Sequence, residues 1–112
     1  MVTAVLGASS DPDRYSFKAM QFLKEEGHQA IPVHPREESV LGEKVWKSLG
    51  ELASAGQKVD TVTVYVNAGL TSKMLPDFLK LAPRRVIFNP GAENAALEKS
   101  LAASGIQVVE AC

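Results

Sequence analysis

The stretch VLGASSDPDRYS, residues 5–16, decides the fold, because it joins a strand to a helix through a turn of small residues. The apolar run Val2–Leu6 predicts the strand. After the turn, apolar residues share one face of a predicted helix over residues 17–26, which Gly27 ends. A strand, a tight turn and a helix in this order are typical of the βαβ unit of a parallel sheet.

Strands and helices alternate along the rest of the chain. Further strands are predicted over the apolar or β-branched runs at residues 29–33, 60–66, 85–88 and 106–109, with a short edge strand at 43–46. Helices are predicted over residues 49–55, 71–81 and 93–103, and Pro76 allows the second of these to begin later than Thr71. Alternation of this kind predicts a parallel sheet covered on both faces. We therefore expect an α/β, doubly wound, Rossmann-like domain with three layers, α/β/α, over residues 1–112.

The composition limits the partners. The 112 residues suit one domain, with 46% hydrophobic residues, 22% charged residues and a net charge of −1. Because there is no excess of positive charge, we expect neither nucleic acid nor a membrane as a partner. No apolar run predicts a signal peptide or a membrane span, so a cytoplasmic location is expected. The single cysteine, Cys112, excludes an internal disulfide and a cysteine-based zinc cluster.

Ligands of such folds bind beyond the carboxyl ends of the strands, where the strand order reverses. The turns at these ends are small or polar: Gly7-Ala8-Ser9-Ser10, His34-Pro35-Arg36, Asn67-Ala68-Gly69 and Asn89-Pro90-Gly91-Ala92-Glu93. The first turn can present backbone N–H groups and two hydroxyls to an anion, beside the positive end of the next helix. The pattern G-x-G-x-x-G is absent, since Ser9 and Pro12 follow Gly7. The alternative use of this turn is a helix cap formed by Asp11 and Pro12.

The second turn separates two classes of nucleotide ligand. An NAD-binding domain places an acidic residue near this position to hold the ribose diol, whereas this chain has His34-Pro35-Arg36. A basic residue suits a phosphorylated ribose, which NADP carries on the 2′ oxygen and coenzyme A on the 3′ oxygen. Arg14 would add a positive charge near a pyrophosphate. The alternative is that Arg36 only begins a solvated charged run over residues 36–38.

Five segments cover almost the whole chain in order: VLGASSDPDRYSFKAMQFLKEEGHQAIPVHP, LGEKVWKSL, DTVTVYVN, RRVIFNPGAEN and GIQVVEAC. With them the chain resembles the CoA-binding-domain family of small stand-alone Rossmann-like proteins. The same domain forms the N-terminal part of the succinyl-CoA synthetase alpha subunit. The combination of segments is specific, although no single segment is. Members usually continue past the EAC of residues 110–112, which implies either a truncated chain or a short last strand here.

The resemblance implies a coenzyme A site built on the turns after the first, second and central strands. With Ser10 and His34, which are added from their positions in the first two turns, the candidate residues are Gly7, Ala8, Ser9, Ser10, Arg14, His34, Pro35, Arg36, Val66, Asn67, Asn89, Pro90 and Gly91. The first turn and Arg14 would face the pyrophosphate, and the turn with Pro35 and Arg36 would lie near the adenosine phosphate. Val66 and Asn67 would border the adenine and ribose. The last three residues of the set would lie beside the ligand's reactive arm.

The sequence offers no convincing set of nucleophile, base and orienting residue. We therefore expect a carrier, sensor or accessory protein for coenzyme A or an acyl-CoA, with a homodimer or a partner enzyme left open. The phosphorylated histidine of the synthetase lies in a further domain and matches neither His28 nor His34, so ligase activity is not implied. An NADP-dependent oxidoreductase, weakened by the missing second glycine, and a nucleotide-binding interaction domain are the alternatives. Under mild oxidation, Cys112 would form a mixed disulfide with the CoA thiol if it lay near it, and a buried free cysteine is the ordinary alternative.

Overall fold

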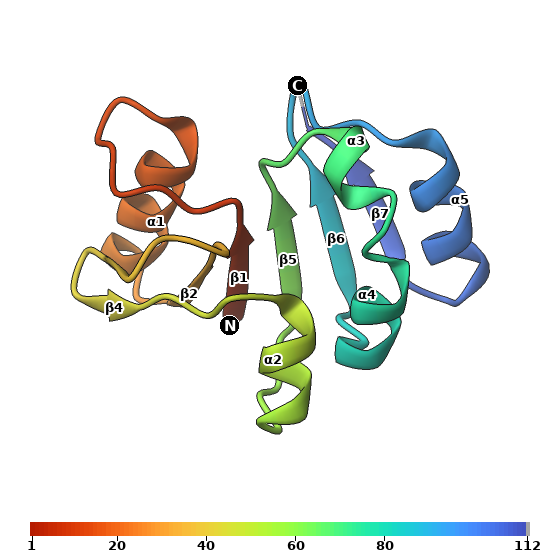
Figure 1. Cartoon of the computed structure of the whole chain (residues 1–112), viewed down its shortest axis with the longest axis horizontal. Helices are drawn as coiled ribbons and strands as arrows, with labels where there is room; N and C mark the ends of the chain where they lie inside the picture. Colours follow the sequence, from red (N-terminus) through yellow and green to blue (C-terminus); the bar gives the residue numbers. More distant parts are fainter. Residues whose placement is uncertain (112) are drawn as a thin grey trace.

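A five-stranded parallel sheet forms the centre of the molecule in the computed structural model, which describes residues 1–111 (Figure 1). Its strands are β1 Val2–Leu6, β2 Gln29–Val33, β5 Thr61–Val64, β6 Arg85–Phe88 and β7 Gln107–Glu110, in the spatial order β2-β1-β5-β6-β7. The order reverses between β1 and β5, so the carboxyl ends of these strands flank the crevice in which such sheets bind ligands. The α/β, doubly wound fold predicted from the sequence is confirmed.

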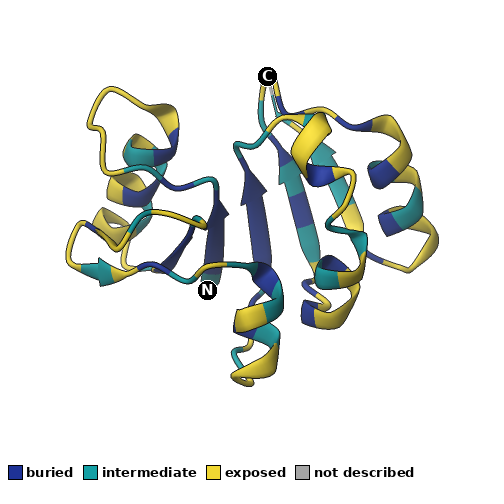
Figure 2. Cartoon of the chain, viewed as in Figure 1, coloured by how far each residue is buried: buried dark blue, intermediate teal, exposed yellow. Residues whose placement is uncertain are grey.

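Helices cover the two faces of the sheet unequally. They are α1 Tyr15–Glu25, α2 Leu49–Ser54, α3 Ala68–Thr71, α4 Leu75–Leu81 and α5 Ala95–Ala103. The larger core packs α2, α4 and α5 on one face, where Phe78, Phe88 and Leu101 are fully buried. A smaller core packs Met20 of α1 against Val5 on the opposite face. Figure 2 shows that β1 and β5, at the point of strand reversal, are buried along most of their length.

The helix predicted over residues 71–81 is two helices. The side chain of Asn67 accepts a hydrogen bond from the Leu70 N–H and starts α3, which ends at Thr71. A new helix, α4, begins at Leu75 with Pro76 in its first turn, where the missing N–H of proline breaks no helical hydrogen bond. The prediction that the helix begins later than Thr71 is therefore confirmed for α4. The sequence did not predict the extra turn of helix before it.

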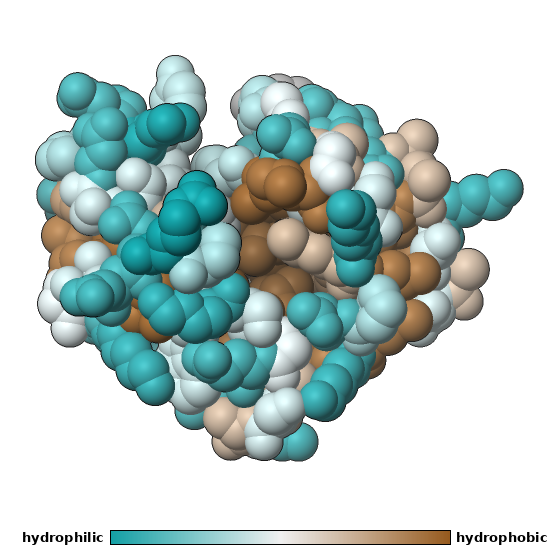
Figure 3. Space-filling view, in the orientation of Figure 1, coloured by the Kyte–Doolittle hydropathy of each residue, from teal (hydrophilic) through white to brown (hydrophobic). Residues whose placement is uncertain are grey.

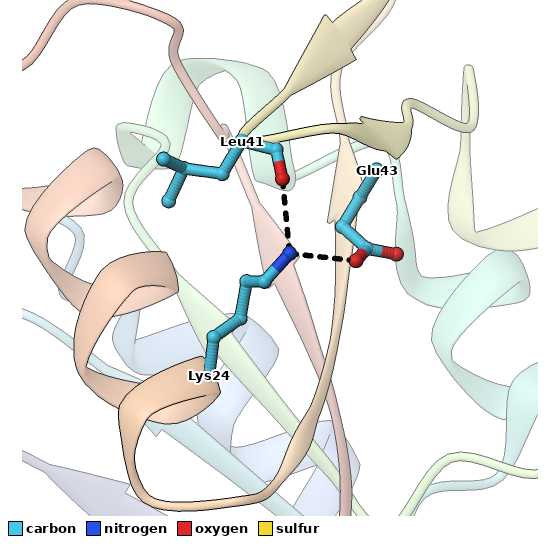
Figure 4. A network of polar contacts seen from close by, with 3 residues as sticks. All are labelled: Lys24, Leu41 and Glu43. Atoms are coloured by element: carbon cyan, nitrogen blue, oxygen red, sulfur yellow. Dashed lines mark hydrogen bonds and ion pairs between the residues drawn. The ribbon is translucent and has the colours of Figure 1, made fainter.

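The short edge strand predicted at residues 43–46 is shorter in the structure. Only Glu43–Lys44 (β4) is a strand, and it pairs with Ser39–Val40 (β3) in a small antiparallel hairpin. Trp46 makes one isolated bridge to Val33 of the main sheet. The ammonium of Lys24 on α1 reaches this hairpin, at 2.9 Å from the Leu41 carbonyl oxygen and 2.8 Å from Glu43 Oε2 (Figure 4). The hairpin, which lies between β2 and α2 in the chain, therefore packs against α1.

The remaining boundaries lie close to the predicted ones. The helix predicted at 17–26 begins at Tyr15, and the strand predicted at 60–66 is limited to Thr61–Val64. Within residues 1–111, no helix has the length and apolar character needed to cross a membrane. Cys112, and with it the predicted mixed disulfide, lies outside the described residues.

Candidate functional site

A cleft of about 770 Å³ opens at the carboxyl ends of β1, β2 and β5, at the strand reversal. Figure 3 shows this hollow near the middle of the molecular face, with hydrophobic surface inside it and hydrophilic surface on its left. Ten predicted site residues line the cleft: Gly7, Ala8, Ser9, Arg14, His34, Pro35, Arg36, Val66, Asn67 and Pro90. The three others, Ser10, Asn89 and Gly91, lie outside its lining. The fold thus brings most of the predicted set together.

Gly7 is required where the turn after β1 passes the chain after β5. Its φ of +90° favours glycine, and a Cβ atom there would lie 2.7 Å from Val66 Cγ2. The N–H groups of Gly7 and Ala8 both donate to the Val33 carbonyl oxygen, at 2.9 and 3.2 Å. These two N–H groups therefore bind the end of β2. We expected them to be free donors for an anion, and this expectation was wrong.

The N-terminus of α1 opens on the same cleft without a capping side chain. Its N-cap residue is Arg14, whose guanidinium has no acceptor atom, and its first turn contains no acidic residue. By contrast, the side chains of Ser48, Asn67 and Asn94 cap α2, α3 and α5. Because no side chain of the described residues caps α1, the first N–H groups of this helix are available to an anion in the cleft.

Asp11 does not cap α1, although its position before Pro12 suggested this alternative. Its Oδ1 accepts a hydrogen bond from the Asp13 N–H at 3.0 Å, and its carbonyl oxygen accepts one from the Arg14 N–H. The Ser9 hydroxyl oxygen accepts the Asp11 N–H at 3.0 Å. These local bonds shape the turn that leads into α1 and leave the helix end open.

His34 organises the turn after β2. Its Nδ1 accepts the backbone N–H groups of Arg36 at 3.0 Å and Glu37 at 3.2 Å, so the ring is neutral and its proton is assigned to Nε2. Burial lowers the pKa of His34, and the positive charges of Arg36 and Lys47 lower it further against the opposing charge of Glu37. The imidazole therefore serves as a hydrogen-bond acceptor that bends the turn around the cleft.

The charged run over residues 36–38 is only partly solvated. Arg36 and Glu38 are exposed, as the alternative interpretation of this run predicts, and Arg36 lines the cleft. Glu37 is bound instead, because its carboxylate accepts the Ser10 N–H at 2.8 Å and the Ser10 hydroxyl at 3.1 Å. Ser10 is thereby engaged by the protein itself.

The two predicted asparagines have structural partners. The side chain of Asn67 caps α3, as described above, and Asn67 also lines the cleft. The Asn89 amide donates to Thr63 Oγ1 at 2.7 Å and to the Val64 carbonyl oxygen at 2.9 Å. The Gly91 N–H donates to Glu93 Oε1 at 2.9 Å. The turn after β6 therefore faces the cleft only through Pro90.

The cleft also contains residues that the sequence did not single out. Lys47 lies at its rim, directly before Ser48, whose hydroxyl accepts the Glu51 N–H at 3.1 Å. The pattern S-x-x-E at residues 48–51 is a capping signature and could have placed this helix start beside the cleft. Leu70 and Met74 add apolar surface, because the break between α3 and α4 lies over the crevice. That break could not be found from the periodicity of residues 71–81.

The charges around the cleft are mixed but favour an anion locally. The cations are Arg14, Arg36 and Lys47, and the carboxylates are Asp13 and Asp77. The three cations lie on the turns after β1 and β2 and before α2, and Arg14 is the N-cap of α1. An elongated ligand with phosphate groups at one end and an apolar part would fit this distribution.

Comparisons with known proteins show the family of this chain. The family model described as "CoA binding domain" matches residues 2–112. The alpha subunit of ADP-forming acetate–CoA ligase II from Pyrococcus furiosus is 44% identical over 50 residues, which are 44% of this chain and 11% of the subunit. The uncharacterized protein YneT of Bacillus subtilis is 31% identical over 77 residues, 69% of this chain and 55% of that protein. The chain thus spans only about a tenth and about half of these curated relatives.

Solved structures have the same fold. An uncharacterized protein with 37% identity superimposes with a TM-score of 0.86 over 99% of this chain and 88% of its own. A Thermus thermophilus protein with 32% identity superimposes with a TM-score of 0.89 over 97% of this chain and 81% of its own. Because the family model matches nearly every residue, and the strand reversal carries the cleft that such a domain needs, the chain belongs to the CoA-binding domain family.

Proposed function

We propose that this chain binds coenzyme A or an acyl-CoA in the cleft at the strand reversal. The observation that carries the proposal is the uncapped N-terminus of α1, which opens on the cleft beside Arg14. A pyrophosphate placed there would accept hydrogen bonds from the first N–H groups of the helix and compensate its positive end. The small residues Ala8 and Ser9 leave room for this approach.

The second part of the proposal concerns the adenosine. Arg36 and Lys47 both line the cleft, Lys47 Nζ donates to the carbonyl oxygen of Glu37 next to Arg36, and the two charges suit the 3′-phosphate of coenzyme A. Val66 and Asn67 would border the adenine and ribose, with Leu70 extending the apolar surface. The reactive arm would then extend towards Pro90. Ser10, Asn89 and Gly91 would support this site from outside the lining rather than contact the ligand.

The biological role belongs to the proposal as well. We expect a cytoplasmic carrier, sensor or accessory protein for coenzyme A, working as a homodimer or beside a partner enzyme. An NADP-dependent oxidoreductase is the second candidate, and the observation in its favour is Arg36, which would serve a 2′-phosphate equally well. The two functions are separated by the ligand that binds.

The test is a thermal-shift series with coenzyme A, acetyl-CoA, dephospho-CoA, NADP and NAD. A ligand at 100 times its dissociation constant stabilises the folded protein by about 2.7 kcal/mol, which for a domain of this size shifts the midpoint by several degrees. We expect a shift with coenzyme A, a smaller one with dephospho-CoA at equal concentration, and none with NADP or NAD. A shift with NADP but not with coenzyme A would overturn the proposal.

A further inference from the structure

One residue, Glu37, joins three separate segments around the cleft through its side chain and its backbone carbonyl. The Glu37 carboxylate, on the turn after β2, accepts the N–H and the hydroxyl of Ser10, on the turn after β1. The backbone carbonyl oxygen of Glu37 accepts a hydrogen bond from Lys47 Nζ at 3.2 Å, which brings in the segment before α2. Each of these three segments contributes residues to the cleft.

The connection through Glu37 differs from the others between these turns. The bonds from Gly7 and Ala8 to Val33 hold the two turns together where they leave the sheet. Glu37 and Ser10 lie further along the turns than these bonds, and neither is among the residues that line the cleft. The bond between them therefore fixes the distance between the outer parts of the two turns, which carry Arg36 on one side and lead into Arg14 on the other.

We infer that Glu37 is a positioning residue, which holds the turn before α1 and the turn that carries Arg36 at the separation required to bind the phosphates of the ligand. This inference rests on the proposed binding of coenzyme A. The role requires an acceptor oxygen that reaches Ser10, not a negative charge. A carboxylate beside an anionic ligand is electrostatically unfavourable, so its presence here is explained by its hydrogen bonds.

Three substitutions of Glu37 separate the effects of side-chain length, of the acceptor oxygen and of the negative charge. Glu37→Ala removes all three, and Glu37→Asp keeps the charge but is too short by one methylene group. Glu37→Gln keeps both the length and an acceptor oxygen. Glu38→Ala is the matched control, because it removes the same charge from the next residue, whose exposed side chain makes no hydrogen bond within residues 1–111.

The experiment measures the dissociation constants of coenzyme A and dephospho-CoA by isothermal titration calorimetry, well below the unfolding temperature of each variant. Loss of a hydrogen bond that orders a binding turn weakens affinity by about tenfold. We expect this loss for Glu37→Ala and Glu37→Asp, with both ligands, because the pyrophosphate turn serves both. Glu37→Gln should retain the wild-type affinity, and Glu38→Ala should be unaffected.

The outcomes are distinct. Wild-type affinity in Glu37→Ala and Glu37→Asp overturns the inference, and so does an equal loss in Glu37→Gln. If Glu37→Ala does not fold, the comparison of Glu37→Asp with Glu37→Gln decides alone. A wild-type protein that binds neither ligand refutes the proposed function itself, whereas wild-type binding with no effect of the Glu37 substitutions refutes only the positioning role.

Discussion

Gly7→Ala tests the close approach on which the cleft depends. The glycine has a φ of +90°, and a Cβ atom would lie 2.7 Å from Val66 Cγ2 and 3.3 Å from the Tyr65 carbonyl carbon. The unfavourable backbone conformation costs about 1–2 kcal/mol for a residue with a side chain. The clash adds about 1–3 kcal/mol, because Val66 Cγ2 belongs to a short, stiff β-branched side chain and the Tyr65 backbone lies close beside it.

Gly91→Ala is the matched control for the backbone term. Gly91 also has a φ of +90°, but no atom lies within 4 Å of the Cβ position in the described structure. Its substitution should therefore cost only the conformational part, about 1–2 kcal/mol. The difference between the two variants isolates the contact between the turn after β1 and the chain after β5.

The assay is urea unfolding followed by circular dichroism, with the free energy of unfolding extrapolated to water. We expect Gly7→Ala to be destabilised by about 2–5 kcal/mol, more than Gly91→Ala, with an unchanged dependence on urea. Val66→Ala removes Cγ2, so it should recover part of the loss when combined with Gly7→Ala in a double-mutant cycle. Equal destabilisation by the two alanine substitutions, or no coupling to Val66, would refute the close approach as the reason for this glycine.

Other predictions concern the ligand, the pH and a helix cap. Arg36→Ala should weaken coenzyme A binding by about 1–3 kcal/mol in calorimetry and leave dephospho-CoA unchanged, and an equal loss for both ligands would contradict the 3′-phosphate assignment. Because burial lowers the pKa of His34, its neutral form contributes stability that is complete above about pH 6.5 and is lost as the pH falls below this value towards the lowered pKa. Urea midpoints measured across this range should fall on acidification in the wild type and less steeply in His34→Gln; identical slopes would remove His34 as the cause. Asn94→Ala should lower the free energy of unfolding by about 1–3 kcal/mol, since the buried amide caps α5 at Leu97 and donates to Thr71 Oγ1 at 3.0 Å. A cost no larger than that of an exposed alanine substitution would show that the cap and its partner are replaceable.

The fold could be predicted because its elements depend on local apolar patterns. The runs that form β1, β2 and β6 have the predicted limits, since buried parallel strands need continuous apolar residues that polar turns interrupt. The hairpin of Ser39–Val40 and Glu43–Lys44 could not be predicted in this way. Its strands have two residues each and are held by contacts with α1, including that of Lys24 with Glu43.

The turns that form the cleft could be predicted, but not the partner of each donor. Position after a strand is a property of the sequence, and it brought ten of the predicted residues to one cleft. Which N–H groups remain available is a property of the tertiary structure. The carbonyl oxygen of Val33 accepts the N–H groups of Gly7 and Ala8, and the carboxylate of Glu37 accepts that of Ser10. In each case the acceptor lies more than twenty positions from the donor in the chain.

The consequence for the proposed site is that the donors left for an anion are those of the helix rather than those of the turn. The turn after β1 uses its own donors to hold its shape, through Val33 and Glu37. These hydrogen bonds hold the turn so that α1 begins at the cleft. Its N-cap is Arg14, and its first turn has no acidic side chain. A chain lacking G-x-G-x-x-G can therefore still present a helix end to a phosphate, provided that another residue fixes the turn. In this protein Glu37 is in the position to do so, and the order of affinities among its alanine, aspartate and glutamine variants would show whether the phosphate site depends on it.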